Sequence, residues 1–359
     1  MILASLAAAA TVDATRVLVL STPEMTAMGG AGIGFATGAD GLLFQPAAPA
    51  NRKIESRARF AGDLVFNRLG LGLGEATDLG NLGGGNGWRG TMNNLGLAGL
   101  YRNFGMGASF ARLAYQRGEQ GVTVYEGHLA GAGNLLDGHL VLGTGYRILQ
   151  LVAVTGDDDV IFEGAGLETG VLVNRVWDGM NFGGVLRLPV TAEPLGSTDG
   201  LRVAAVDVPW EASFAVAWGE FEMIRPTRVA ADLVIAGPVD DGLSLEALMA
   251  DQTVARGAKA TLSPRLGVET GLWPGRLKWR VGAYLEPSRT DVRPARLHGT
   301  TGFELKLFHL KALGLVDHDL AWKTSVDAAR GYVNFGWIGL GLWQRGEVGV
   351  DYDPPAPPS

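Results

Sequence analysis

The sequence has no cysteine, few charged residues and no long hydrophobic run, and each absence narrows the class of protein. The lack of cysteine fits an oxidising periplasm, where stray thiols would pair, although a cytosolic protein can also lack cysteine. The longest uncharged run, Met25 to Ala39, has 15 residues, which is too short for a transmembrane helix. The net charge of -7 and the pI near 5.3 argue against a nucleic-acid partner, which binds through a basic face.

Motifs of enzymes and cofactor sites are also missing. No Gly-x-Ser-x-Gly elbow occurs, which argues against a serine hydrolase. Gly30 and Gly32 begin like a dinucleotide-binding loop, but the third glycine of that motif would fall on Phe35. We therefore expect no catalytic residue, no cofactor and no metal site. Asp157 to Asp159 is compatible with a solvated loop, or with a site for a divalent cation. The five histidines do not lie at metal-ligand spacing: they are His128, His139, His298, His309 and His318.

What the chain does contain is glycine and a strict alternation of polar and apolar residues. The 54 glycines are about twice the usual share, and glycine is unfavourable inside helices. In Arg276 to Glu286 and again in Arg296 to Lys306, even positions are mostly polar or charged and odd positions mostly apolar. A strand has period two, so each stretch has one wet face and one apolar face. Each stretch has about 11 residues, the length that a tilted strand needs to cross a bilayer.

Strands of this kind suggest a barrel with lipid outside and polar groups in its lumen. The same parity predicts which side chains point into that lumen. We expect the following polar residues to face it: Arg57, Arg59, Arg228, Asp232, Arg276, Lys278, Arg280, Arg296, His298 and Glu304. Trp210 and Trp218 share the opposite face, and their spacing along the membrane normal is roughly 20 Å, close to that of two aromatic girdles. A soluble sandwich also alternates and stays the alternative, although it explains the strand length and the tryptophan positions less well.

Fourteen stretches read as strands, so the expected fold is an all-β transmembrane antiparallel β-barrel of about 14 strands. They are 54–66, 92–101, 105–116, 121–133, 138–152, 159–175, 179–192, 206–220, 226–236, 257–272, 276–287, 296–308, 310–325 and 331–343.

The two ends of the chain do not read as strands. Met1 to Ala10 looks like the end of a signal peptide, and residues 1–14 are the expected signal region. Cleavage could follow Ala8-Ala9-Ala10 or Val12-Asp13-Ala14, and the basic n-region is missing. Residues 351–359 form a Pro-rich tail that we expect to be flexible.

Residues 25–48 contain the small-residue stretch Met28-Gly29-Gly30-Ala31-Gly32, then Asp40, and then Gln45-Pro46-Ala47. Together these resemble the N-terminal hatch of the FadL-like family of outer-membrane transporters for hydrophobic compounds. Met28-Gly29-Gly30-Ala31-Gly32 fits the small-residue stretch of that family, and Asp40 fits its acidic turn. Gln45-Pro46-Ala47 fits its Asn-Pro-Ala motif, with Gln in place of Asn. Pro264 to Glu269 and Leu277 to Pro287, with Tyr284-Leu285-Glu286-Pro287, follow the order of its late strands.

The resemblance implies a plug or hatch at residues 15–50 inside a barrel at residues 51–350. It implies a bacterial outer-membrane channel for diffusion-driven uptake of small hydrophobic molecules, fatty-acid-like or aromatic. The gating residues would be those of the hatch: Met28, Gly29, Gly30, Ala31, Gly32, Gln45, Pro46 and Ala47. The implied partners are outer-membrane lipid, the hydrophobic substrate and the barrel-insertion machinery, for a chain that acts as a monomer. The alternative is a non-transporting barrel that anchors or shuttles secreted proteins at the outer membrane.

Overall fold

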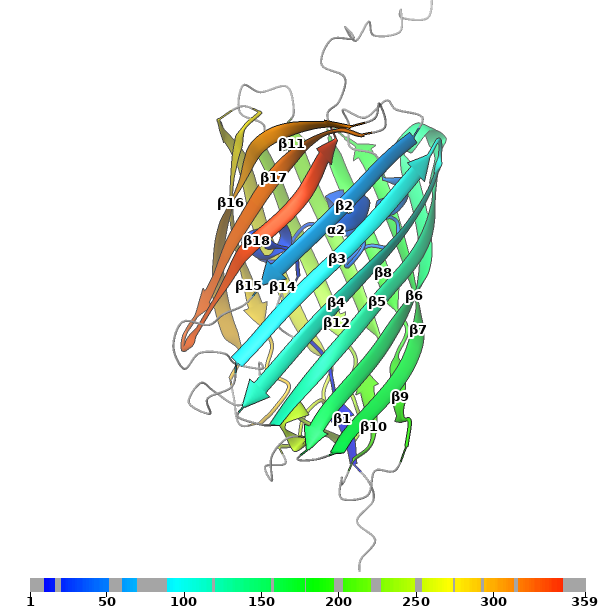
Figure 1. Ribbon diagram of the computed structural model, residues 1–359, viewed down its shortest axis with the longest axis vertical. Coiled ribbons are helices and arrows are strands. Elements are labelled where there is room, and N and C mark those ends of the chain that lie inside the picture. The colour runs from blue at the N-terminus through cyan, green and yellow to red at the C-terminus, as the bar shows by residue number, and fades with distance from the viewer. Residues whose placement is uncertain are drawn as a thin grey trace, which may run out of the picture.

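The computed structural model describes most of the chain as one barrel (Figure 1). The described residues are 10–16, 21–51, 60–69, 89–117, 120–155, 158–177, 179–196, 203–220, 227–248, 254–273, 275–291, 294–312 and 316–344. Arg57, Arg59, Asp157, the first nine residues of the expected signal region and the Pro-rich tail lie outside these ranges.

Fourteen of the described strands form a closed antiparallel barrel, which confirms the predicted fold class. The first and last of these strands, β2 and β18, pair with each other and close the ring, so no strand of the ring is left with an unpaired edge. In chain order the strands are β2 (Phe60–Leu69), β3 (Arg89–Tyr101), β4 (Phe104–Arg117), β5 (Gln120–Leu135), β6 (Leu140–Thr155), β7 (Asp158–Val176), β8 (Met180–Arg187), β11 (Glu211–Glu220), β12 (Thr227–Ala236), β14 (Thr261–Trp273), β15 (Leu277–Glu286), β16 (Arg296–Ala312), β17 (Val316–Ala329) and β18 (Tyr332–Gln344).

The two faces of the wall follow the alternation of the sequence. On β15, Trp279 and Val281 are 37% and 40% exposed on the outside. Arg280 and Tyr284, at even positions, are each 1% exposed and face the lumen. Because a strand places successive side chains on opposite faces, one register fixes the direction of every side chain along it.

The two ends of the barrel differ. At the upper end in Figure 1, tight turns join the strands, such as Arg102–Asn103 between β3 and β4. At the lower end, the connection from β8 to β11 carries β9 (Val190–Pro194) and β10 (Val203–Val208). The connection from β12 to β14 carries β13 (Gly242–Leu243) and a 3-10 helix, η4 (Leu245–Leu248). We call the upper end the turn end and the lower end the loop end.

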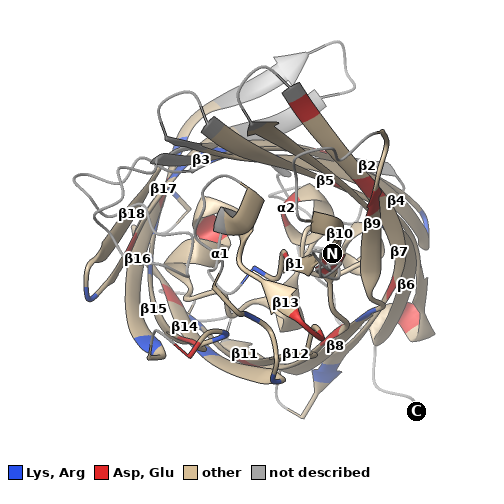
Figure 2. Ribbon diagram, turned by 90° about the horizontal axis from the view of Figure 1, so that it is seen from below, with Lys and Arg blue, Asp and Glu red and all other residues tan. Residues whose placement is uncertain are grey.

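The chain enters the lumen from the loop end. Strand β1 (Ala10–Asp13) pairs in parallel with β10 and β13, so it joins the two long connections. Residues 21–51, the lumen segment, then pass through the ring as four short helices (Figure 2). These are α1 (Pro23–Ala27), η1 (Ile33–Phe35), α2 (Gly38–Gly41) and η2 (Ala48–Ala50).

The lumen segment contacts the wall on all sides. Helix α1 packs on β15 to β18, η1 on β7, β8, β11 and β12, α2 on β2 to β4, and η2 on β3 to β6. No helix in the described part of the chain is long and apolar enough to cross a membrane.

Candidate functional site: the lumen segment and the pocket beside it

Ion pairs hold the two α-helices of the lumen segment against one strand of the wall. Lys323 on β17 donates to Glu24 of α1 at 2.8 Å and also to Asp40 of α2. Burial favours a neutral Glu24, but Arg280 and Lys323 lower the pKa of this carboxyl well below its ordinary value. Burial raises the pKa of Asp40, and nearby Glu24 adds to that shift while Lys323 opposes it. The Thr22 hydroxyl accepts from the Met25 amide and caps α1.

Arg280 lies at the centre of a larger cluster of charges. Its guanidinium donates to Glu269 at 2.7 Å and to Glu304, and it lies 3.4 Å from Glu24. The three carboxylates lie within 4.8 Å of one another, close enough for a metal ion. The guanidinium supplies positive charge to all three carboxylates, so the four groups form an ion-pair network. Lys278, at 3.5 Å, adds a further cation on Glu269.

The glycine turn after α1 lies directly on the backbone of the wall. Gly29 and Gly30 have φ values of 65° and 75°, a region that favours glycine. A Cβ on Gly29 would lie 2.6 Å from the Ala283 nitrogen, and a Cβ on Gly282 would lie 2.3 Å from the Met28 carbonyl carbon. The Met28–Gly29 backbone and the wall can approach this closely only because Gly29 and Gly282 have no side chains.

Asp232 on β12 holds the next part of the segment. One oxygen of its carboxylate accepts hydrogen bonds from the Gly32 amide at 2.8 Å and from the Ile33 amide at 3.0 Å. These amides begin the 3-10 helix η1, where amide groups lack partners within the helix. Ala31, just before this point, is fully buried. Asp232 therefore fixes where the segment turns along the wall.

The Gln-Pro-Ala motif packs against β6, β7 and β8. The Gln45 amide donates to the carbonyls of Val171 at 3.2 Å and Gly184 at 3.3 Å. A Cβ on Gly143 would lie 2.4 Å from the Pro46 carbonyl group, so the motif also needs a glycine at this position of the wall. Ala47 is fully buried.

At the loop end, Asp13 of β1 ties the chain to two connections. It accepts from Arg289 at 2.8 Å and lies 3.2 Å from Arg256. Burial alone would raise the pKa of Asp13, but Arg256, Arg289 and the Thr15 hydroxyl hold it below its usual value. The charge of Asp13 therefore stabilises the docking of β1.

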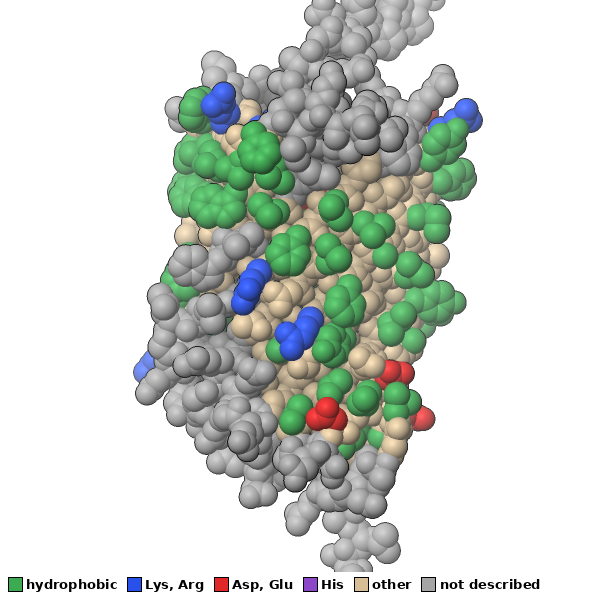
Figure 3. Space-filling model, in the orientation of Figure 1, with side chains coloured by type: hydrophobic (Ala, Val, Ile, Leu, Met, Phe, Trp, Pro, Cys, Tyr) green, Lys and Arg blue, Asp and Glu red, His purple; other side chains and the backbone are tan. Residues whose placement is uncertain are grey.

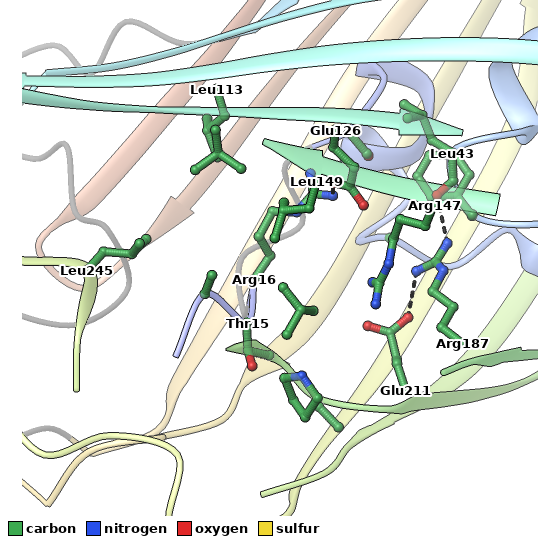
Figure 4. Close-up of a pocket in the computed structure, with 18 of the residues that line it drawn as sticks. Thr15, Arg16, Leu43, Leu113, Glu126, Arg147, Leu149, Arg187, Glu211 and Leu245 are labelled. Atoms are coloured by element: carbon green, nitrogen blue, oxygen red, sulfur yellow. Dashed lines mark hydrogen bonds and ion pairs between the residues drawn. The ribbon is translucent and has the colours of Figure 1, made fainter. Parts of the chain in front are cut away.

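A cavity of about 110 Å³ lies between the lumen segment and β4, β5, β6, β8, β11 and β14. We call it the lumen pocket. Hydrophobic side chains from the segment, the wall and η4 point toward it (Figure 4). They include Leu43, Phe44, Leu113, Leu149 and Leu245.

Arginines and glutamates line the other side of the lumen pocket. Arg187 donates to Glu211 at 2.7 Å and to the Leu43 carbonyl at 2.7 Å, which links wall and segment (Figure 4). Arg16 pairs with Glu126. Arg147 is 5% exposed and donates a hydrogen bond to the backbone carbonyl of Leu188 at 3.3 Å. The pocket is thus amphipathic.

A second polar cluster fills the lumen near the loop end of β15 to β18. His298 lies between Asp327 at 2.8 Å and Glu286 at 2.9 Å, and its ring stacks on Tyr284. Arg296 donates to Glu286 at 2.6 Å.

The remaining predicted lumen residues lie in different settings. Arg228 lies 3.7 Å from Glu269, with its guanidinium 5.6 Å from the Phe35 ring of η1. Arg276 lies in the turn before β15, exposed, with its guanidinium 5.1 Å from the Trp273 ring.

The charged residues that line the lumen pocket were missing from the predicted set of lumen-facing residues. Parity would have found them, since each lies at an inward position of a predicted strand: Glu126, Arg147, Arg187, Glu211 and Arg265.

No protein-family model matches the sequence, and no curated protein matches it. Solved structures do match the fold over most of its length. A FadL homologue of Pseudomonas aeruginosa aligns over 90% of this chain and 96% of its own, with 11% identity and a TM-score of 0.54. The toluene transporter TbuX of Ralstonia pickettii aligns over 89% and 96%, with 14% identity and a TM-score of 0.55. The toluene transporter TodX of Pseudomonas putida aligns over 91% and 99%, with 11% identity and a TM-score of 0.54. The chain therefore has the fold of the FadL-like barrels that its N-terminal motifs resemble.

Proposed function

We propose that this protein is a bacterial outer-membrane channel through which small hydrophobic molecules, fatty-acid-like or aromatic, enter by diffusion. The observation that carries the proposal is the lumen pocket, which is lined by hydrophobic side chains and bounded by a segment that spans the lumen. The similar structures are named as a FadL homologue and as toluene transporters, which supports the same class of substrate.

The size of the lumen pocket supports a gating role for residues 15–50, the expected plug. Ligand pockets usually hold about 300–1,000 Å³, and an apolar cavity of about 150 Å³ is enough for benzene. The pocket here, at about 110 Å³, is smaller than either. A substrate therefore needs the segment to move, and the hatch residues Met28 to Gly32 and Gln45 to Ala47 are the contacts that must loosen.

Two further parts of the proposal concern partners. The ring of described strands is closed, so it offers no free strand edge to a second copy, which supports a monomer. The barrel-insertion machinery would place the chain in the membrane, as the resemblance implies.

An uptake assay with a hydrophobic fluorescent probe in cells tests the channel. Leu149→Trp adds bulk inside the lumen pocket, whereas Ile148→Trp adds the same bulk outside the same strand. We expect the first variant to reduce uptake toward that of cells lacking the protein, and the second to match the parent. Heat-modifiable mobility on gels checks that both variants fold.

If the parent itself does not raise uptake above cells lacking the protein, the channel proposal fails. The alternative function, a barrel that anchors or shuttles secreted proteins, then takes its place. The ion pairs that fill much of the lumen around Arg280 are the observation that favours this second candidate.

A further inference from the structure

A row of polar side chains crosses the outer face of the barrel from β2 to β7. The strand register aligns Arg68 with Asn93, and Asn93 with Arg112. It continues from Arg112 through Tyr125 to Gln150 and then Glu163. All six occupy outward positions, because the residue just before each on its strand is buried on the lumen side: Asn67, Met92, Ala111, Val124, Leu149 and Phe162. The outer wall therefore carries a polar row where other strands carry apolar residues.

The position of the row along the strands matches the edge of a membrane. On β4 the outward residues between the turn end and Arg112 are Phe104, Met106, Ala108 and Phe110. Eight residues at about 3.3 Å each, tilted by about 40°, span roughly 20 Å, close to the apolar band of about 25 Å in such barrels. Short turns mark the periplasmic side and long loops the outside. Arg112 thus lies at the headgroup level of the outer leaflet, and Arg68, two tilted strands away in register, lies roughly 6 Å nearer the middle of the membrane.

The cationic end of the row has no acidic partner in the described part of the chain. Arg68 is exposed, and the guanidinium of half-buried Arg112 lies 6.0 Å from the Tyr125 ring. At the other end, by contrast, Gln150 donates to Glu163 at 2.5 Å. An outward arginine is strongly unfavourable at mid-membrane and much less so near the interface. Two adjacent ones on the lipid side point to an anion that neutralises them.

The spacing of the two arginines suits a phosphate group. They lie two strands apart, roughly 10 Å between backbones, and Asn93 lies between them. Arginine side chains are long enough to converge across this distance, and guanidinium groups bind phosphate oxygens in pairs. The Asn93 amide, between them, supplies a further donor.

We propose that Arg68, Asn93 and Arg112 bind the phosphorylated headgroup of a glycolipid in the outer leaflet. The wall between this site and the turn end supplies the surface for the acyl chains. In Figure 3, hydrophobic side chains are scattered over the face above the cationic side chains near its centre. Leu95 and Leu97 of β3 are among the exposed hydrophobic residues of this wall. The polar donors for the headgroup and the apolar wall for the acyl chains thus lie in the same order as these two parts of a lipid. A soluble anion would use only the arginines, on a chain whose net charge is -7.

The proposal rests on the outer-membrane location stated above, but not on transport. Its test uses the purified barrel in non-ionic detergent, with diphosphoryl lipid A and its dephosphorylated form as probes. The variants are Arg68→Ala/Arg112→Ala, the conservative Arg68→Lys/Arg112→Lys, and Arg276→Ala, which removes an exposed arginine at the turn end. Native mass spectrometry reports lipid bound per barrel, and gel mobility before and after heating reports folding.

We expect the parent to prefer the diphosphoryl form and the double alanine variant to bind it at least about tenfold more weakly, since each charge-assisted bond contributes about 1.5–3 kcal/mol. Arg276→Ala should bind like the parent, and the lysine variant should recover part of the affinity. Equal binding by parent and alanine variant, no preference for phosphate, or full competition by millimolar inorganic phosphate would overturn the site. Probe uptake in cells should not change in the double variant, so a failed channel and a failed lipid site give different results.

Discussion

A close backbone contact between the lumen segment and the wall can be tested by adding one methyl group. In Gly282→Ala, the new Cβ would lie 2.3 Å from the Gly29 nitrogen and from the Met28 carbonyl carbon. Both are backbone atoms, which cannot rotate away as a side chain can. An ordinary contact begins at 3.4 Å, so the segment must retreat by about 1 Å. From the alternation alone, position 282 would be expected to face water in the lumen and to tolerate substitution.

The retreat has a cost that follows from the neighbouring hydrogen bonds. A shift of about 1 Å stretches the bond from Gly32 to Asp232, now 2.8 Å, beyond hydrogen-bond range. The bond from Ile33 to the same carboxylate, now 3.0 Å, is lost with it. Bonds to a charged group contribute about 1.5–3 kcal/mol each, so the docked segment loses about 3–6 kcal/mol. We expect it to undock while the ring of strands stays closed.

Hydrogen exchange of residues 21–51 in the purified barrel measures this docking. Gly299→Ala is the matched control, because it is the same change on the adjacent strand and its new Cβ would meet nothing within 4 Å. The Gly282→Ala variant should exchange its lumen segment much faster than the control, with unchanged exchange in the strands. Equal protection in both variants would refute the reasoning that bare backbone contact holds the segment.

Three further outcomes are expected. Val281→Arg, at an outward position near the middle of β15, should destabilise the barrel by about 2–4 kcal/mol in a denaturant titration in lipid, and Leu285→Arg, near the strand end, by about 0–1 kcal/mol. Lys323→Met should make the lumen segment sensitive to protease through loss of its pairs with two carboxylates, whereas Trp322→Met, outward on the same strand, should not. Because the pKa of Asp13 is lowered in the folded state, its stabilisation is complete above about pH 4 and is lost as the pH falls through the lower folded value, so exchange of β1 should rise only in acid.

The wall could be predicted from the sequence because one local rule, a period of two, governs it. The predicted strand at 121–133 is β5, Gln120–Leu135. The predicted break near residue 309 is wrong in detail, since β16 runs on to Ala312. The register of β16 against β17 shifts between Lys306 and Phe308, so the parity changes there and the alternation looks interrupted.

The predicted strand at 206–220 fails for a different reason. It divides into β10, which ends at Val208, and β11, which begins at Glu211. Both pieces alternate, but β10 pairs with β9 and β1 at the loop end, while β11 belongs to the barrel. Period two describes any half-buried strand, so the pattern cannot tell a strand of the wall from a strand of a connection.

The path of the lumen segment needs information that no local pattern contains. Gly29 was visible in the sequence, but the backbone that requires a glycine there, at Ala283, lies more than 200 residues away. The same holds for the charges. Parity predicts that Arg280 and Arg147 face the lumen, yet their roles differ because of their neighbours across the closed ring. Arg280 has three carboxylates within 3.4 Å and is part of the ion-pair network, whereas Arg147 donates to a carbonyl beside the lumen pocket. Which inward charge is neutralised and which faces a ligand depends on barrel closure and register, so it is a property of the fold rather than of any strand.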